Sequence, residues 1–318
     1  MLNQAFSRAT FYFWTGINME TLVIALGGNA LLQRGAVLSA ENQYKSIALI
    51  ADAIGKLAKK YRIAVVHGNG PQVGLLALQN LAYRDVPPYP LDILVAESQG
   101  MIGYMLAQQL AAFHPAQPVT TLLTRIQVDG NDPAYKEPSK FIGPIYAPEQ
   151  KQELEQKYGW VMKLDGSHLR RVVPSPEPKR IIDIEAIHLL LSKNHIVICN
   201  GGGGIPMVAD DNGLVGSEAV IDKDLSCALL AEVLNADHLV VLTDADAIYQ
   251  NWGTPQQSAI RSATTEELAP MAVADGAMGP KIMAVSRFVN RSGKVAHIGG
   301  LKDIDAVLAG TAGTLVTR

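Results

Sequence analysis

Glycine clusters directly follow three apolar, strand-like runs of this 318-residue sequence. Because glycine lacks a Cβ and tolerates positive φ, such a loop lets the backbone approach a ligand closely. Successive backbone N–H groups there form a concave site for anions, which the positive end of a following helix strengthens. One such loop alone could be an ordinary turn, but three together predict a cradle for a polyphosphate or an acyl phosphate. The candidate phosphate-binding residues are Gly27, Gly28, Asn29, Gly68, Asn69, Gly70, Gly202 and Gly203.

The loops do not match the two common nucleotide-binding motifs. None continues into the Gly-Lys-Ser/Thr of a Walker A loop. Gly68-Asn69-Gly70 lacks the later glycine of a dinucleotide fingerprint and is followed by Pro71-Gln72. The pattern therefore argues against a P-loop enzyme and against a dinucleotide-dependent dehydrogenase.

Two lysines stand at the predicted starts of helices, where the helix dipole disfavours positive charge. Lys223 lies in Asp222-Lys223-Asp224, and Lys281 follows Gly279-Pro280. Phosphoryl transfer needs positive charge beside the transferring group, because negative charge spreads over its oxygens in the transition state. We therefore predict catalytic roles for both lysines, with an ordinary surface lysine as the alternative for each. The flanking aspartates could orient Lys223 or hold Mg²⁺ through water and phosphate oxygens, and the sequence shows no dedicated metal-ligand set.

Polar residues also close the apolar run at 238–243. Thr243-Asp244-Ala245-Asp246 follows this run and precedes Tyr249. Side chains at a strand end are well placed to contact a nucleotide, and turn capping by aspartate is the alternative. We expect Asp244 and Tyr249 to lie on the nucleotide side of the site.

Short apolar runs alternate with longer helical patterns, which predicts an α/β fold. Strands are expected at Thr21–Leu26, Ile63–His67, Val119–Leu123, His195–Asn200, His238–Thr243 and Lys294–Ile298. Helices are expected at Glu41–Lys59, Asp92–Phe113, Ile184–Ser192, Asp222–Asn235 and Lys281–Asn290. This alternation is typical of a parallel sheet covered by helices on both faces. Ligands of such sheets bind at the carboxyl ends of the strands, where the glycine loops and lysines are predicted to lie.

One segment, residues 129–178, breaks this alternation. It is rich in proline and charged residues, and it also contains Phe141, Ile142, Ile145, Tyr146 and Trp160. A segment this long within a compact domain is usually a lid or a small subdomain. Its apolar residues favour a protruding subdomain over a disordered insertion.

Composition and charge exclude several classes of protein. The formal net charge is -3, which does not indicate a nucleic-acid-binding protein. No apolar stretch is long enough to span a membrane. The two cysteines, Cys199 and Cys227, are too few for a disulfide framework and fit a reducing, cytoplasmic environment. Residues 1–18 match no clear pattern before Met19, and we interpret them as an N-terminal extension or a start-site artefact.

From Thr21 to Thr314 the sequence resembles carbamate kinases of the amino-acid-kinase fold. The motifs that carry the resemblance are Ala25–Ala30, His67–Gly74, Glu97–Tyr104, Asn131–Ala134, Ser139-Lys140, Ile142–Pro144, Arg170–Pro176, Gly201–Pro206, Glu218–Leu225 and Met278–Lys281. Position 25, where many other kinases of this fold have a lysine, is alanine here, as in carbamate kinases. Leu91–Glu97 and Asn251–Gln257 are similar to the carbamate kinases of allantoin and purine breakdown.

The resemblance implies an open αβα sandwich, a homodimer and reversible phosphoryl transfer between ATP and carbamate. It implies one domain over residues 19–318, with a carbamate-side lobe at about 19–205 and a nucleotide lobe at about 206–318. Lys223 and Lys281 would then contact the ATP phosphates, and Lys140 would reach carbamoyl phosphate from the subdomain. Asp222 would share the catalytic site, and Met278 and Gly279 would join Asp244 and Tyr249 around the nucleotide. Mg²⁺ would bind mainly through the ATP phosphates.

The resemblance also implies ATP formation from ADP and carbamoyl phosphate during nitrogen catabolism, of arginine or of allantoin and purines. Two alternatives remain open at this point. One is another small-molecule kinase with the same fold, although the excursion at 129–178 would be unexpected there. The other is a nucleotide-sensing regulatory protein, although such a protein need not keep the three lysines.

Overall fold

The structure of the chain is a computed structural model that describes residues 19–33, 35–211, 213–273 and 277–318. The predicted N-terminal extension, residues 1–18, lies outside the described residues. Among the described helices, none combines the length and apolarity needed to cross a membrane.

An eight-stranded sheet forms the centre of the molecule. Its strands are β1 (Glu20–Leu26), β2 (Tyr61–His67), β3 (Val119–Thr121), β9 (Ile196–Ile198), β12 (His238–Thr243), β15 (Ser262–Thr264), β16 (Val295–Gly300) and β17 (Thr314–Thr317). They are ordered β15-β17-β16-β12-β1-β2-β9-β3. Neighbours pair in parallel from β16 across to β3, and the direction reverses between β16 and β17. All six strands predicted from the sequence lie in this sheet, so the predicted mainly parallel α/β fold is confirmed.

The helices are α1 (Gly28–Leu31), α2 (Ala40–Leu57), α3 (Gly70–Ala82), α4 (Leu91–Phe113), α5 (Lys151–Tyr158), α6 (Ile184–Ser192), α7 (Lys223–Val233), α8 (Thr265–Ala272), α9 (Gly279–Ser292) and α10 (Ile304–Leu308). The five helices predicted above are present, and each of their ten boundaries lies within two residues of the prediction. Most of the helices pack on one of the two faces of the sheet.

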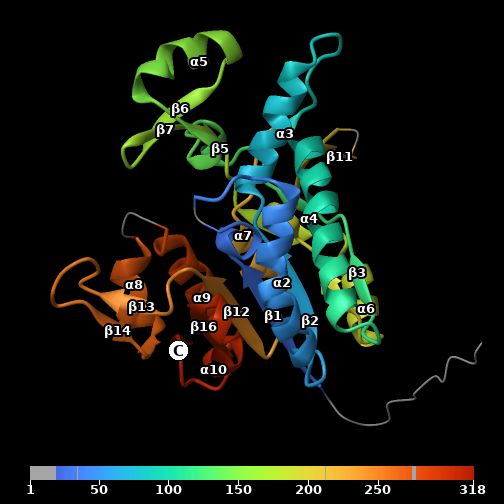
Figure 1. Cartoon of the computed structure of the whole chain (residues 1–318), viewed down its shortest axis with the longest axis vertical. Coiled ribbons are helices and arrows are strands. Elements are labelled where there is room, and N and C mark those ends of the chain that lie inside the picture. The colour runs from blue at the N-terminus through green and yellow to red at the C-terminus, as the bar shows by residue number, and fades with distance from the viewer. Residues whose placement is uncertain (1–18, 34, 212, 274–276) are drawn as a thin grey trace, which may run out of the picture.

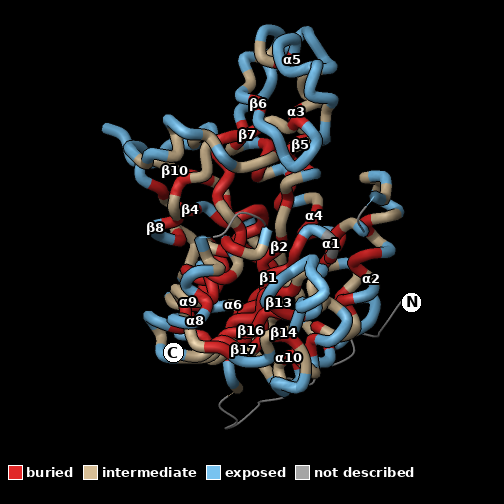
Figure 2. The backbone as a smooth tube through the Cα atoms, turned by 90° about the vertical axis from the view of Figure 1, so that its left-hand side faces the viewer, coloured by how far each residue is buried: buried red, intermediate tan, exposed pale blue. Residues whose placement is uncertain are grey.

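Alternating side chains of β1 explain the three layers. Leu22 and Ile24 face a cluster completed by α1, α2, α4 and α10, whereas Val23 and Ala25 face a cluster completed by α6, α7, α8 and α9. Successive side chains of a strand point to opposite faces, so an apolar strand needs helices on both sides. Buried residues accordingly concentrate along the central sheet in Figure 2.

A small subdomain projects from this sandwich. Its strands β5 (Lys140–Tyr146), β6 (Val161–Asp165) and β7 (His168–Val173) form an antiparallel sheet in the order β5-β7-β6, with α5 beside it. Leu154, Met162 and Leu169 form its own apolar cluster. Figure 1 shows these elements at the top of the molecule, away from the central sheet. They fall within the segment at 129–178, and the lobe boundaries themselves stay a prediction.

The remaining strands form two small sheets. β11 (Gly213–Gly216), β10 (Ile205–Asp210), β4 (Arg125–Val128) and β8 (Pro178–Ile181) form the first, in that order. β13 (Ile248–Gln250) and β14 (Ser258–Ile260) pair as a hairpin.

Candidate active site

The parallel register brings two of the glycine loops to one edge of the sheet. Leu26 at the end of β1 pairs with His67 at the end of β2, and on its other side with Leu242 of β12. Gly27 and Gly68, which follow these strand ends, therefore lie side by side. The N–H of Gly27 donates to Leu242 O at 2.9 Å, which fixes the first loop against the neighbouring strand.

A buried carboxylate joins the two lysines that the sequence singled out. Lys223 Nζ donates to Asp224 Oδ1 at 2.5 Å, and Lys281 Nζ donates to Asp224 Oδ2 at 3.0 Å. Lys223 is the first residue of α7, and Lys281 lies in the first turn of α9. The packing of α7 against α9 thus places two positive charges on one aspartate.

Asp222 caps α7 and binds the third lysine. Its Oδ1 accepts hydrogen bonds from the N–H groups of Asp224 at 2.8 Å and Leu225 at 3.2 Å, as expected for an N-cap. Its Oδ2 accepts a hydrogen bond from Lys140 Nζ at 2.5 Å. Because Lys140 begins β5, the subdomain contributes one residue to the cluster at the helix N-terminus.

Electrostatics keep the cluster charged. Burial by itself would raise the pKa of Asp224, but Lys223 and Lys281 outweigh it and hold this pKa well below the ordinary range. Burial likewise acts to lower the pKa of Lys223, yet Asp224 raises it above its ordinary value. Burial would also raise the pKa of Asp222, and Lys140 reverses that shift. All three lysines are therefore paired with ionised carboxylates at neutral pH.

The three lysines differ in access to solvent. The Lys140 side chain is 31% exposed, compared with 11% for Lys223 and 14% for Lys281. A ligand at the strand edge can thus displace Lys140 from Asp222 more easily than it can separate the other two from Asp224. The geometry provides a fixed pair of charges and a third one carried by the subdomain.

The first two loops border this cluster in different ways. A Cβ placed on Gly68 would lie 3.7 Å from Cδ of Lys223, so the second loop lies against the stem of that lysine. A Cβ placed on Gly28 would meet no atom within 4 Å, so packing within the described chain does not explain this glycine. The side chain of Asn29 lies outside the described part of the structure. Whether these loops bind phosphate stays a prediction.

The third loop is packed inside the protein. Gly202 and Gly203 are buried and have φ values of +65° and +100°. A Cβ on Gly202 would lie 2.1 Å from the Asn69 amide nitrogen, and one on Gly203 would lie 2.3 Å from Ile221 O. Internal packing therefore accounts for glycine at both positions, as expected for an ordinary turn. Their predicted phosphate contact gains no support from this geometry.

His67 ends β2 beside the second loop but is not placed to act as a base. It is buried, and burial lowers its pKa to about 4. Its Nδ1 lies 2.9 Å from Gly68 O, and a Cβ on Gly201 would come within 2.5 Å of its Nε2. The neutral ring fills the space between the second and third loops.

The predicted nucleotide residues lie on the β12 and α9 side of the edge. Asp244 is exposed just beyond β12, and the Tyr249 hydroxyl donates to Asp246 Oδ1 at 2.7 Å. Met278 occupies the N-cap position of α9, and Gly279 is its first residue. The ring of Trp252 lies 5.2 Å from that of Tyr249. No contact with a nucleotide is tested by this arrangement.

Two features were missing from the predicted site. Asp224 was considered only as a flank of Lys223, yet it holds both lysines, and the Asp-Lys-Asp pattern was the available signal. Ser98 and Gln99 of α4 were named only within the motif Glu97–Tyr104 and were given no role in the site. Ser98 Oγ accepts a hydrogen bond from the Asn69 amide at 2.9 Å, and the Gln99 amide donates to Gly201 O at 2.9 Å. The helix thus fixes the second and third loops.

The aspartates do not fit a metal site of their own. Both oxygens of Asp222 and of Asp224 already accept hydrogen bonds from lysines or from the start of α7. Across residues 19–33, 35–211, 213–273 and 277–318, no group of three or more histidine, cysteine, aspartate or glutamate residues could hold a metal ion.

Sequence and structure comparisons place the chain in a family. Residues 20–300 match the model of the amino acid kinase family. The chain is 65% identical over 299 residues to a carbamate kinase of Escherichia coli K12, covering 94% of this chain and all of that protein. It is 50% identical to a carbamate kinase of Rhizobium meliloti over 93% of each chain. The chain belongs to the carbamate kinases of the amino acid kinase family.

Solved structures of carbamate kinases support the same assignment. The carbamate kinase of Giardia lamblia bound to AMP-PNP superposes with a TM-score of 0.86 at 35% identity, covering 94% of this chain and 99% of that one. The predicted family and the amino-acid-kinase fold are therefore confirmed. The catalytic roles of individual residues are not tested by this similarity.

Proposed function

We propose that this protein catalyses reversible phosphoryl transfer between ATP and carbamate, with Lys140, Lys223 and Lys281 as the catalytic cations. The observation that carries the proposal is the convergence of these lysines, from β5, α7 and α9, on two neighbouring aspartates. Three positive charges at the carboxyl edge of a parallel sheet match the charge of a transferring phosphoryl group. Membership of the carbamate kinases supports the choice of substrate.

The lysines divide into two roles in this proposal. Lys223 and Lys281, fixed by Asp224, neutralise the phosphates of the nucleotide and of the transferring group. Lys140 leaves Asp222 to bind the phosphate of carbamoyl phosphate, which its greater exposure permits. Asp222 keeps the start of α7 in place and receives Lys140 again when the substrate leaves.

The glycine loops hold the carbamoyl end of the substrate. Gly27, Gly28 and Asn29 would do so from the first loop, and Gly68, Asn69 and Gly70 from the second. Their position between β1, β2 and Lys223 supports this assignment. Asp244, Tyr249, Met278 and Gly279 would surround the nucleotide on the other side of the lysine pair.

The chemistry needs positioning more than a base. An oxygen of the carbamate anion attacks the γ-phosphorus of ATP, and the bond to the bridging oxygen of ADP breaks. In the opposite direction, an oxygen of the ADP β-phosphate attacks the phosphorus of carbamoyl phosphate, the bond from phosphorus to the carbamate oxygen breaks, and carbamate leaves. Because the nucleophile is already an anion, no proton must be removed. The buried His67, whose Nδ1 lies 2.9 Å from Gly68 O and whose pKa burial lowers to about 4, is consistent with chemistry that needs no base.

Mg²⁺ remains part of the proposal as an ion that arrives with the nucleotide. The engaged oxygens of Asp222 and Asp224 do not offer it a ready site, so its ligands would be mainly phosphate oxygens and water. We propose that the physiological direction is ATP formation from ADP and carbamoyl phosphate in nitrogen catabolism, in the cytoplasm.

We also propose that the protein is a homodimer. One face of α4 exposes the large apolar side chains of Ile93 and Tyr104, of which Tyr104 is 62% exposed, and Phe113 is exposed at the end of the helix. The neighbouring strand β3 is an edge of the central sheet. An exposed apolar helix beside a sheet edge favours association with a second copy of the chain. Light scattering of the purified protein at micromolar concentration should give twice the 34.1 kDa chain mass.

The direct test of function is ATP formation from ADP and Mg²⁺ with carbamoyl phosphate, compared with acetyl phosphate. We expect fast ATP formation from the first and little from the second. Preference for acetyl phosphate would indicate another small-molecule kinase. A folded protein that binds ADP but makes no ATP from either substrate would indicate a nucleotide sensor.

A further inference from the structure

The backbones of α3 and β5 meet at two glycines. A Cβ placed on Gly74 would lie 2.0 Å from Cα of Gly143 and 2.3 Å from its nitrogen. Real Cβ atoms do not approach backbone this closely, so only glycine at position 74 permits the contact. The two glycines belong to the motifs His67–Gly74 and Ile142–Pro144, and the proposed chemistry gives neither glycine a role.

This contact joins the two parts of the site that bind carbamoyl phosphate in the proposed function. α3 begins at Gly70, directly after the second glycine loop, and β5 begins at Lys140. Lys140 is three residues before Gly143 on the same strand. A Cβ on Gly70 would lie 3.8 Å from Phe141 O, so the contact between α3 and β5 extends to the second glycine loop.

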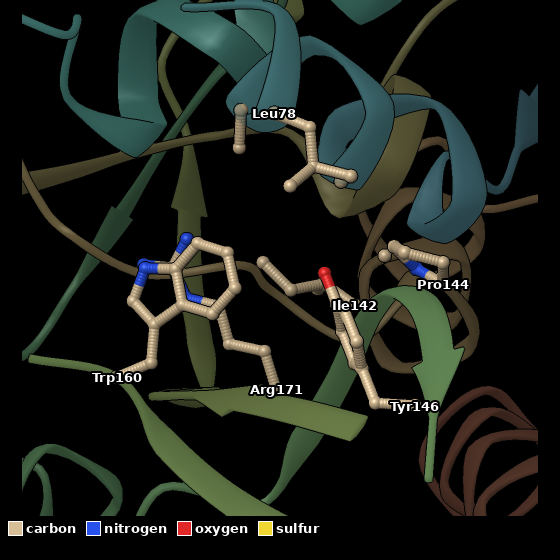
Figure 3. A pocket seen from close by; sticks show the side chains of 9 residues that line it. Leu78, Ile142, Pro144, Tyr146, Trp160 and Arg171 are labelled. Carbon is tan, nitrogen blue, oxygen red and sulfur yellow. The ribbon is translucent and has the colours of Figure 1, made fainter. Parts of the chain in front are cut away.

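The interface between α3 and the subdomain is tightly packed around Ile142 and contains a small cavity beside Leu78. Ile142, next to Gly143, is buried in an apolar cluster with Val73 and Ala77 of α3. Beside the glycine contact, a small cavity that Gly74 and Gly143 also line separates Leu78 of α3 from Trp160 and Tyr146 of the subdomain, as Figure 3 shows. Arg171 also lines this cavity, with its guanidinium 4.8 Å from the centre of the Trp160 ring.

Gly143 itself is held in a special conformation. Its φ is +71°, it lies where the pairing of β5 with β7 is interrupted, and its carbonyl accepts a hydrogen bond from Arg170 at 3.2 Å. The contact of backbone on backbone is thus one of the contacts that hold the subdomain against α3, together with the packing of Ile142 on Val73 and Ala77. It lies on the same strand as Lys140.

We propose that Gly74 and Gly143 are positioning residues that set the reach of Lys140 toward the substrate. The inference rests on the proposed function, because it assigns Lys140 to carbamoyl phosphate. The close contact fixes the distance between β5 and the second glycine loop, and the small cavity beside it is bordered by both glycines. Any side chain at position 74 separates β5 from α3 and withdraws Lys140.

Gly74→Ala is the sharpest test of this proposal. Alanine favours the helical backbone of α3, so the change acts through its methyl group. Gly143→Ala is less informative, because its positive φ strains any side chain. The matched control is Gly130→Ala, at the base of the same segment, where an added Cβ would make only an ordinary contact, 3.7 Å from Val208.

We expect Gly74→Ala to lower kcat/KM for carbamoyl phosphate by about tenfold or more, since a misplacement of about 1 Å can cost up to about a hundredfold. The dissociation constant of ADP, measured by titration calorimetry, should stay within about twofold of wild type. Gly130→Ala should resemble wild type in both. In a Lys140→Ala background, Gly74→Ala should change the rate by less than about twofold, because the residue that it displaces is gone.

Leu78→Phe provides a second route if Gly74→Ala folds poorly, because it adds volume to the cavity from α3 and leaves both glycines in place. It should reduce the rate in the same Lys140-dependent way. The proposal would be overturned if Gly74→Ala or Leu78→Phe lowered kcat/KM equally with Lys140 present and in the Lys140→Ala background. It would also be overturned if both variants kept the wild-type kcat/KM. A wild-type protein that makes no ATP from carbamoyl phosphate would overturn the proposed function itself, and the positioning role with it.

Discussion

Lys281 donates to Asp224 across 3.0 Å, although 57 residues separate them in the chain. The same carboxylate accepts a hydrogen bond from the adjacent Lys223. A single buried aspartate thus holds two lysines from two helices, and it defines the distance between them. This relationship makes Asp224 the structural centre of the proposed site.

Removal of the Asp224 carboxylate should affect stability and activity together. Asp224→Ala leaves two lysines buried beside each other without a partner, and breaking a buried ion pair in this way costs about 3–5 kcal/mol. Asp224→Asn keeps the shape and should lose less. Urea unfolding at pH 7 measures the free energy of unfolding of both variants. A wild-type free energy of unfolding for Asp224→Ala would contradict the buried ion pairs of Asp224 with Lys223 and Lys281.

Lys140→Ala should affect one substrate only. Because Lys140 comes from the subdomain and pairs with Asp222 at the surface of the cluster, we expect a raised KM for carbamoyl phosphate and a lower kcat. The affinity for ADP should be nearly unchanged. Steady-state kinetics with ADP titrations measures both. A parallel loss of ADP affinity would mean that Lys140 does not act on the carbamate side.

The first and third glycine loops should respond differently to alanine. Gly28→Ala adds a Cβ that meets no described atom, so the free energy of unfolding should change by less than about 0.5 kcal/mol while carbamoyl phosphate turnover falls. Gly202→Ala forces a residue with φ of +65° against Asn69 and should cost about 2 kcal/mol or more of stability. If Gly28→Ala kept wild-type turnover and Gly202→Ala lost turnover without losing stability, the phosphate-binding role would belong to the third loop.

His67 should make stability depend on pH. Its pKa is lowered by burial to about 4, from an ordinary value near 6.5, so the folded state excludes a proton that the unfolded state binds. The stability is therefore complete above about pH 6.5 and is lost as the pH falls toward 4, by about 3 kcal/mol in total. His297 is buried with a similarly lowered pKa and adds to this effect. Urea unfolding gives the free energy of unfolding at pH 7 and at pH 5. Its change between these pH values should be smaller for His67→Gln than for wild type, and an equal change would contradict the lowered pKa of His67.

The central sheet could be predicted because buried parallel strands read as short apolar runs. Thr21–Leu26 and His238–Thr243 correspond to neighbouring strands whose residues face helices on both sides. The lysines could be found because positive charge is unusual at the start of a helix. Lys223 and Lys281 do lie in the first turns of α7 and α9.

The remaining features depend on distant parts of the chain. Nothing local to Lys281 indicates that it shares Asp224 with Lys223, because that pairing arises from the packing of α7 on α9. Gly202 looks like a ligand-binding glycine until its contact with Asn69 is known. The contact of Gly74 with Gly143 likewise appears only when the subdomain is folded against α3.

The most direct test of the account compares wild type with Lys223→Ala in ATP formation from ADP, Mg²⁺ and carbamoyl phosphate. We predict that wild type is active and that the variant, still folded by circular dichroism, loses roughly a hundredfold to a thousandfold in kcat, as when a preorganised charge-stabilising group is removed. Turnover by Lys223→Ala close to that of wild type would show that the lysine cluster is not where the phosphoryl group is transferred.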